Sequence, residues 1–112
     1  MKDLLKTYPV RKVEYESNGE IVTLLIRNEN PTIIEKFFFK KHLDKVHKID
    51  LDKIGTFVWN HCSGKINVEE ISKLAELEFG EEVKPAETRV QTFIKQLFKN
   101  RFIQLYVAEE KN

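Results

Sequence analysis

Three histidines and one cysteine are the first side chains to consider as metal ligands or as members of a catalytic group: His42, His47, His61 and Cys62. His42 and His47 are five residues apart, whereas a helical pair of metal ligands needs an i, i+4 spacing. His61 and Cys62 are adjacent, so on a helix their side chains point in different directions. A zinc site completed by a carboxylate is the alternative, but the pattern favours a polar surface histidine and a small buried cysteine. We therefore expect no bound metal.

Other kinds of catalytic chemistry also lack a matching arrangement of residues. The four glycines are well separated along the chain, so no glycine-rich loop can surround a phosphate group: Gly19, Gly55, Gly64 and Gly80. No serine–histidine–acid or cysteine–histidine pattern stands out. The sequence predicts a protein that is not an enzyme and that needs no cofactor.

The composition is that of an ordinary globular chain. With 112 residues, the chain is long enough to bury a core as one domain over residues 1–112. Its formal net charge of +1 argues against a domain-wide attraction to nucleic acid or to an anionic membrane. A single cysteine excludes an internal disulfide and fits a reducing compartment. Because the start resembles no signal peptide and no apolar run has membrane length, we expect a cytoplasmic protein.

Residues 51–71, which include Trp59, carry the clearest local signals and would position any site. Asp52 is a typical N-cap residue, and it predicts a helix over residues 52–62. One face of this helix is apolar at spacings of three and four: Ile54, Phe57, Val58 and Cys62. Gly64 can adopt the left-handed conformation that ends a helix. Gly55 is unfavourable inside a helix, which indicates close approach of another backbone, with a hinge as the alternative.

Two further helices follow. Asn67 and Glu70 form a capping box for a helix over residues 68–79, which Gly80 ends. Its inward residues are expected to be Val68, Ile71, Leu74, Ala75 and Phe79. Pro85 suits the first turn of a helix that extends to Lys99. The apolar stripe of that helix consists of Val90, Phe93, Ile94, Leu97 and Phe98. Asn100 is expected to end it in the left-handed conformation, and residues 102–107 have a strand-like pattern.

The first half of the chain has a strand pattern. Residues 1–9 are expected to be a loosely ordered lead-in, and residues 108–112 a frayed tail. Residues 10–16 alternate, and Asn18-Gly19 predicts a hairpin to a central strand at residues 21–26. Turn residues at 28–31 end that strand. A third strand is expected at residues 46–51, after a connection that is either a short helix or irregular.

Three features allow both a structural and a functional interpretation. Trp59 is expected to pack beneath the sheet with its N–H bonded to a carbonyl, and stacking on a ligand is the alternative. The phenylalanines at 37–39 cannot all face one core, so they contribute either packing or a partner surface. A lysine series is either a solvated face or part of a surface for an acidic partner: Lys36, Lys40, Lys41, Lys45, Lys48 and Lys53.

The predicted order of elements indicates an α+β fold. An N-terminal three-stranded antiparallel sheet is followed by three helices with short turns, which is the outline of a winged helix-turn-helix. A DNA-binding transcription regulator is one function of such a fold. However, the third helix opens among acidic residues that would repel phosphates: Glu81, Glu82 and Glu87. The sequence therefore argues against binding of nucleic acid.

The apolar and glycine spacing of residues 51–71 resembles the family of coenzyme pyrroloquinoline quinone synthesis protein D, PqqD. The matching residues are Leu51, Asp52, Gly55, Trp59, Ser63, Gly64, Lys65, Val68 and Ile71. Further residues fit the third helix and closing segment of that family: Phe93, Ile94, Leu97, Arg101, Phe102 and Ile103. The resemblance covers about residues 46–105. It implies a winged-helix peptide-binding domain, the recognition element for precursors in pathways that make ribosomally synthesised, post-translationally modified peptides.

The resemblance also implies a mechanism and a site. Members of the family hold the leader of a precursor peptide as an added strand and present it to a modifying enzyme, often a radical S-adenosylmethionine enzyme. Carried onto this chain, the peptide-binding residues are Val46, His47, Lys48, Ile49, Asp50, Arg89, Thr92, Phe93 and Gln96. A third alternative, beside the adaptor and the transcription regulator, is a docking domain that binds only the partner enzyme.

Overall fold

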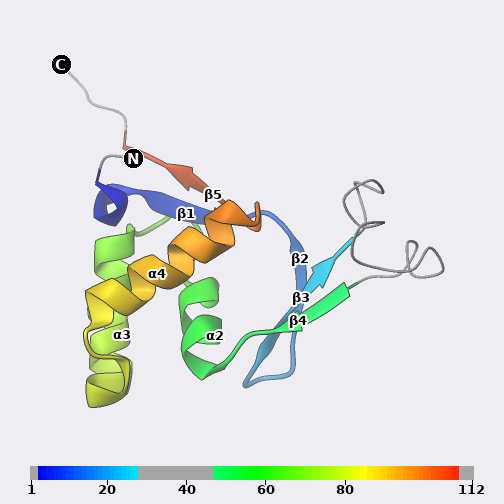
Figure 1. The fold of residues 1–112 in the computed structure, drawn as a ribbon, viewed down its shortest axis with the longest axis horizontal. Coiled ribbons are helices and arrows are strands. Elements are labelled where there is room, and N and C mark those ends of the chain that lie inside the picture. Colours follow the sequence, from blue (N-terminus) through cyan, green and yellow to red (C-terminus); the bar gives the residue numbers. More distant parts are fainter. Residues whose placement is uncertain (1–2, 28–46, 109–112) are drawn as a thin grey trace.

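The computed structural model describes residues 3–27 and 47–108 of this chain (Figure 1). Within these residues it shows an α+β fold with two antiparallel sheets and three α-helices. In the view of Figure 1 the helices occupy one side, and a three-stranded sheet stands at the other. The expectations for the turn at 28–31, the connection at 32–46 and the phenylalanines at 37–39 lie outside the described residues. Within the described ranges, no helix is long and apolar enough to span a membrane.

The three-stranded sheet agrees with the predicted sheet. It contains β2 (Glu14–Ser17), β3 (Val22–Ile26) and β4 (His47–Asp50), with β3 in the centre and both pairs antiparallel. The hairpin between β2 and β3 is confirmed: Gly19 has a φ of 98°, and the Asn18 side chain accepts hydrogen bonds from the backbone of residues 20 and 21. These local bonds fix the register of the hairpin.

A second sheet of two strands corrects the prediction of a loose lead-in. Asp3 caps a 3₁₀ turn, η1 (Leu4–Lys6), and β1 (Tyr8–Arg11) then pairs with β5 (Ile103–Tyr106) near the other end of the chain. Leu4 is buried. The expected single strand over residues 10–16 is therefore wrong, because the chain passes from one sheet into the other between β1 and β2. The predicted strand at 102–107 is confirmed as β5.

The three helices begin where their caps predict. Asp52 accepts a hydrogen bond from the Gly55 N–H at the start of α2 (Lys53–Asn60), and the Asn67–Glu70 capping box starts α3 (Val68–Phe79). Gly80 ends α3, and a 3₁₀ turn, η3 (Gly80–Val83), leads to α4 (Ala86–Lys99). Pro85 is the N-cap residue of α4, one position before the expected first turn.

The end of α2 differs from the prediction. Gly64 does have a positive φ, 83°, but α2 has ended before it, at Asn60. The Arg11 guanidinium donates hydrogen bonds to the backbone carbonyls of Trp59 and Asn60, both 3.2 Å long. Free carbonyls at the last turn of a helix attract such a cation. Arg11 on β1 therefore joins the end of α2 to the two-stranded sheet.

The end of α4 also requires a correction. Asn100 has a φ of −87°, and Arg101 takes the left-handed conformation with a φ of 64°. The N–H of Arg101 donates to the Phe98 carbonyl and the N–H of Phe102 to the Leu97 carbonyl. This is the Schellman arrangement, in which the left-handed residue is one position later than the sequence suggested.

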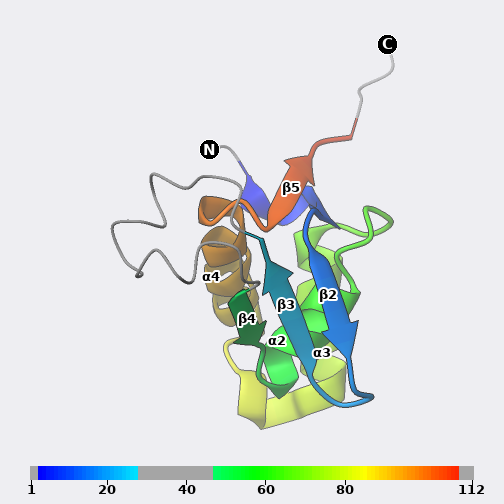
Figure 2. The same ribbon diagram turned by 90° about the vertical axis from the view of Figure 1, so that its right-hand side faces the viewer.

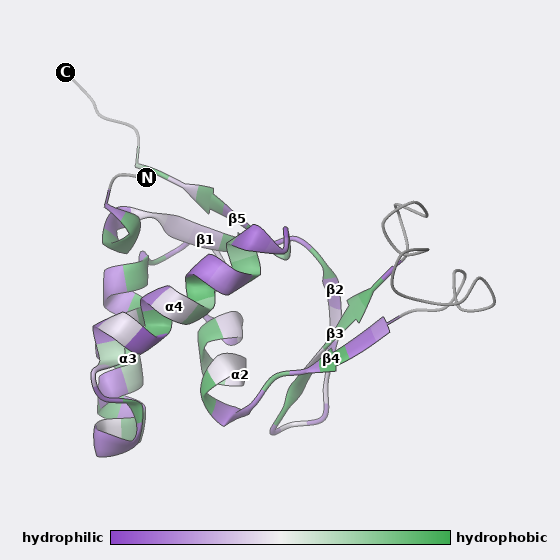
Figure 3. Cartoon of the chain, viewed as in Figure 1, coloured by the Kyte–Doolittle hydropathy of each residue, from purple (hydrophilic) through white to green (hydrophobic). Residues whose placement is uncertain are grey.

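The core lies among the three helices, η1, β5 and the inner face of the three-stranded sheet. Its largest fully buried side chains are those of Trp59, Leu24, Ile71, Ile94 and Ile103. Figure 3 shows apolar and polar residues alternating along α4, as expected for a helix with one buried face. Two predicted core residues are partly exposed, namely Leu74 at 38% and Phe98 at 39%.

Two expectations about residues of α2, Gly55 and Trp59, are also corrected. The group close to Gly55 is a side chain: a Cβ there would lie 3.1 Å from the Phe93 ring and 3.0 Å from the Asp52 carboxylate. Trp59 is fully buried and stacks edge-to-face with Tyr15, at 5.6 Å between ring centroids. Its indole N–H has no hydrogen-bond partner among the described residues, instead of the expected carbonyl.

Candidate functional site

The outer edge of β4 is the first component of the candidate site. β4 pairs with β3 on one side, and within residues 3–27 and 47–108 no strand pairs with its other side. The Leu51 N–H donates to the Val22 carbonyl at 2.8 Å, which makes these two residues a hydrogen-bonded pair. In an antiparallel ladder such pairs alternate, so His47 and Ile49 also direct their backbone groups toward β3.

The alternation has a direct consequence for the free edge. The backbone N–H and C=O groups of Lys48 and Asp50 point away from β3. An edge with outward-pointing donors and acceptors is a template for another extended chain. β4 therefore offers a backbone ladder at two of its four residues.

An apolar pocket lies beside this edge. It has a volume of about 250 Å³ and is situated between the inner face of the sheet and the C-terminal half of α4. Figure 2 shows β4 as the strand of the sheet that lies next to α4. The pocket is lined by Leu24, Ile49, Leu51, Phe93, Gln96, Leu97, Asn100 and Phe102. Its apolar walls and two amide side chains fit an apolar side chain carried by a backbone.

The structure brings some of the predicted site residues together. Ile49 on β4 and Phe93 and Gln96 on α4 line the same pocket. Ile49 is 40% exposed although its side chain is apolar. Its neighbours Lys48 and Asp50 lie on the opposite face of the sheet, where Lys48 is 3.9 Å from Glu16 and Asp50 accepts a 2.6 Å hydrogen bond from Thr23.

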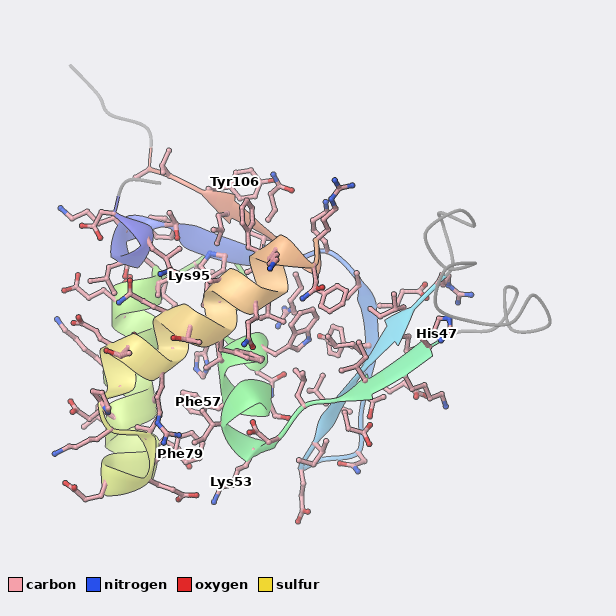
Figure 4. The ribbon with its side chains drawn as sticks, viewed as in Figure 1. His47, Lys53, Phe57, Phe79, Lys95 and Tyr106 are labelled. Carbon is pink, nitrogen blue, oxygen red and sulfur yellow. The ribbon has the colours of Figure 1, made fainter. Side chains whose placement is uncertain are left out.

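The remaining predicted residues lie around the pocket or away from it. His47 is half-buried at the start of β4, paired with Ile26 (Figure 4). Arg89 and Thr92 are exposed on α4 nearer its start, and neither lines the pocket. Val46 lies outside the described residues.

Sequence reasoning missed five pocket residues: Leu24, Leu51, Leu97, Asn100 and Phe102. Three of the lining residues follow Phe93 at helical spacing, so a signal for the α4 wall was present. No sequence signal placed Phe102 in the pocket lining, because its position depends on the conformation of the turn after α4.

A larger cavity of about 620 Å³ lies between α3 and the start of α4. Its walls include Ser72, Lys73, Glu76 and Glu87. It adjoins no strand edge and contains none of the predicted site residues, so size alone does not identify the site here.

The residues considered for metal or nucleophilic chemistry are separated or buried. Within the described ranges, no three His, Cys, Asp or Glu side chains form a group that could hold a metal ion. Cys62 is buried, as predicted, and its thiol donates to the Val58 carbonyl at 3.3 Å. The His61 ring is 2.8 Å from the Phe57 carbonyl. These contacts are those of structural side chains.

The buried thiol leads to a prediction for alkaline pH. Burial raises the pKa of Cys62 from 9.0 to about 12, and the nearby Arg11 opposes part of this rise. Above its ordinary pKa the unfolded chain loses this proton first, so the stability that the thiol contributes falls as pH rises toward 12. At about pH 10.5 the loss should be about 2 kcal/mol relative to about pH 8.

Urea unfolding of the wild type and of Cys62→Ala at both pH values measures this loss. The Cys62→Ala variant retains every other titrating group, so it should lack this part of the pH dependence. An equal loss of stability in both proteins would show that the thiol is not responsible.

Comparison with known proteins gives one match. The sequence model of the family described as coenzyme PQQ synthesis protein D (PqqD) matches residues 42–103. Searches of curated proteins and of solved structures each found no match. The matched segment contains β4, all three helices and the whole apolar pocket except Leu24. Because the match spans more than half of the 112 residues, the chain belongs to the family of coenzyme PQQ synthesis protein D.

Proposed function

We propose that this protein is a non-catalytic adaptor that holds the leader of a ribosomally synthesised precursor peptide and presents it to a modifying enzyme. The leader adds as a strand to the outer edge of β4, and one of its apolar side chains enters the pocket beneath α4. A radical S-adenosylmethionine enzyme is the proposed partner, on the strength of the family. We also interpret the three helices with the β1–β5 pair as a winged helix-turn-helix.

The observation that carries this proposal is the combination of edge and pocket. Lys48 and Asp50 direct their backbone groups outward, and Ile49 between them lines an apolar pocket with Phe93. A peptide that pairs with the edge can therefore place alternate side chains toward α4. Backbone bonds supply part of the affinity, whereas the pocket reads the sequence.

The transcription-regulator alternative receives no support. Glu81, Glu82 and Glu87 are all exposed around the start of α4, the end of the helix that would meet base edges. Their charges oppose an approach to phosphates.

Hydrogen exchange on the protein with a bound peptide tests the proposal. The probe is a peptide selected for binding to this protein by mRNA display. The library consists of random twelve-residue peptides, each linked to the mRNA that encodes it. We expect the amides of Lys48 and Asp50 to become protected, because an added strand supplies them with acceptors. The amides of His47 and Ile49 already face β3 and should change little. Protection confined to another surface would overturn the proposal.

A further inference from the structure

Two cationic pockets surround the C-terminal end of α4, next to the apolar pocket beside β4. Each has a volume of about 480 Å³, and both are lined by Lys12 and Arg101. The first also includes Val13, Glu14, Leu25, Ile26, Arg27, Asn100 and Phe102, and the second includes Phe98, Lys99, Ile103 and Gln104. Four cations thus face two pockets whose lining contains a single carboxylate, that of Glu14.

The positive charge of these pockets is largely uncompensated. Arg27 forms an ion pair with Glu14, 2.9 Å from nitrogen to oxygen. In the part of the chain that the structure describes, no ion pair includes Lys12, Lys99 or Arg101. The Lys12 N–H donates to the Phe102 carbonyl at 3.0 Å, so the backbone of Lys12 is fixed beside the end of α4.

The backbone of Arg101 is also held in one conformation. It occupies the left-handed position of the Schellman arrangement, where glycine is usual because it has no Cβ. Two hydrogen bonds fix the turn, from the Arg101 and Phe102 N–H groups to carbonyls in the last turn of α4. Placing arginine there disfavours the turn, and Arg101 lines both pockets.

The first cationic pocket adjoins the apolar pocket beside β4. Asn100 and Phe102 line both, so the two pockets lie on either side of these residues. A chain that stays extended as it leaves the apolar pocket past Asn100 and Phe102 would enter the first cationic pocket, which Arg101 lines. Alternate residues of an extended chain point to the same face.

We infer that Arg101 and Lys12 recognise a carboxylate of the bound peptide, which places an acidic residue an even number of positions from the apolar anchor. This inference rests on the proposed function and specifies its ligand as an acidic, amphipathic peptide. Arginine and lysine bind carboxylates through charge-assisted hydrogen bonds, and the fork of arginine gives them direction. The lining of the first pocket also contains three apolar residues beside these cations: Val13, Ile26 and Phe102.

The experiment compares peptides selected from the randomised dodecapeptide library by the wild type and by three variants. Arg101→Gly removes the guanidinium and introduces the residue best suited to the backbone conformation, so the fold should be retained. Lys12→Gln removes the second cation. Lys65→Gln is the matched control, because Lys65 is exposed and lines none of these pockets.

We expect the wild type and the control to enrich an apolar residue together with Asp or Glu at even spacing. Arg101→Gly and Lys12→Gln should enrich only the apolar residue. For one selected peptide, its affinity for Arg101→Gly should be about tenfold weaker than for the wild type, and its Glu→Gln form should bind both proteins equally.

Each contrary outcome has a distinct meaning. Enrichment of an apolar residue without an acidic one would overturn the inference and leave the proposed function standing. Equal acidic enrichment by Arg101→Gly and by the wild type would show that another cation reads the peptide. Displacement of the peptide by a duplex DNA would assign the cationic pockets to phosphate. A Lys48→Pro variant, in which proline blocks the β4 edge, serves as the negative control for the selection. If the wild type enriches peptides no better than this variant does, the proposed function itself is overturned.

Discussion

A Lys48→Pro substitution is expected to weaken binding of a library-selected peptide at least tenfold while the protein remains folded. The N–H of Lys48 points to the free edge of β4, so proline removes a donor that only an added strand would use. The proline ring also occupies the space in which the peptide backbone would lie. Fluorescence anisotropy of the labelled peptide measures the affinity, and circular dichroism confirms the fold.

Two companion variants make this prediction specific. Lys48→Ala removes the same side chain and keeps the N–H, so peptide affinity should change little. Ile49→Pro instead removes a donor that faces the Leu24 carbonyl within the sheet, and should reduce the free energy of unfolding by about 1–3 kcal/mol. If all three variants stay equally stable and bind equally well, a peptide does not add to β4.

A Trp59→Ala substitution is expected to reduce the free energy of unfolding by about 3–5 kcal/mol, the usual range for a large buried aromatic residue. Trp59 has no exposed surface and is in contact with Tyr15 of the sheet, so its removal opens a cavity between sheet and helices. Small domains have a total stability of about 5–15 kcal/mol, so much of the variant should be unfolded at moderate urea concentrations. Urea unfolding followed by circular dichroism measures the change.

Trp59→Phe provides the matched comparison. The indole N–H has no partner among the described residues, and phenylalanine removes this buried donor while retaining a ring. The loss of stability should therefore be less than half of that for Trp59→Ala. Leu77→Ala, at a leucine that is 83% exposed, should change stability by less than about 0.5 kcal/mol. A Trp59→Phe variant as unstable as Trp59→Ala would indicate that the N–H is bonded.

The parts of the fold predicted correctly are those specified by neighbouring residues. Asp52, the Asn67–Glu70 pair and Asn18-Gly19 each act on backbone groups within three positions of themselves. The β1–β5 pair had no such signal, because its strands are separated by most of the chain. Its stability depends on contacts between segments far apart in the sequence, such as the bond from the Gly64 N–H to the Pro9 carbonyl.

The candidate site shows the same division. The family resemblance pointed to β4 and α4, and Ile49, Phe93 and Gln96 do meet there. Which residues of β4 face outward depends on the register with β3, and a shift of one residue would exchange their roles. The left-handed residue after α4 was placed one position early, because Asn100 and Arg101 could both end the helix and asparagine has the better intrinsic preference.

Under the proposed function, the short length of β4 limits how long a peptide would stay bound. Two outward residues offer at most four backbone hydrogen bonds, two as donors and two as acceptors, each contributing about 0.5–1.5 kcal/mol. With one anchor pocket, this fits an affinity near the micromolar range, about 8 kcal/mol. At an association rate constant of about 10⁶ M⁻¹ s⁻¹, such a complex dissociates in about a second. A carrier with that residence time could release a modified peptide promptly and take up the next one.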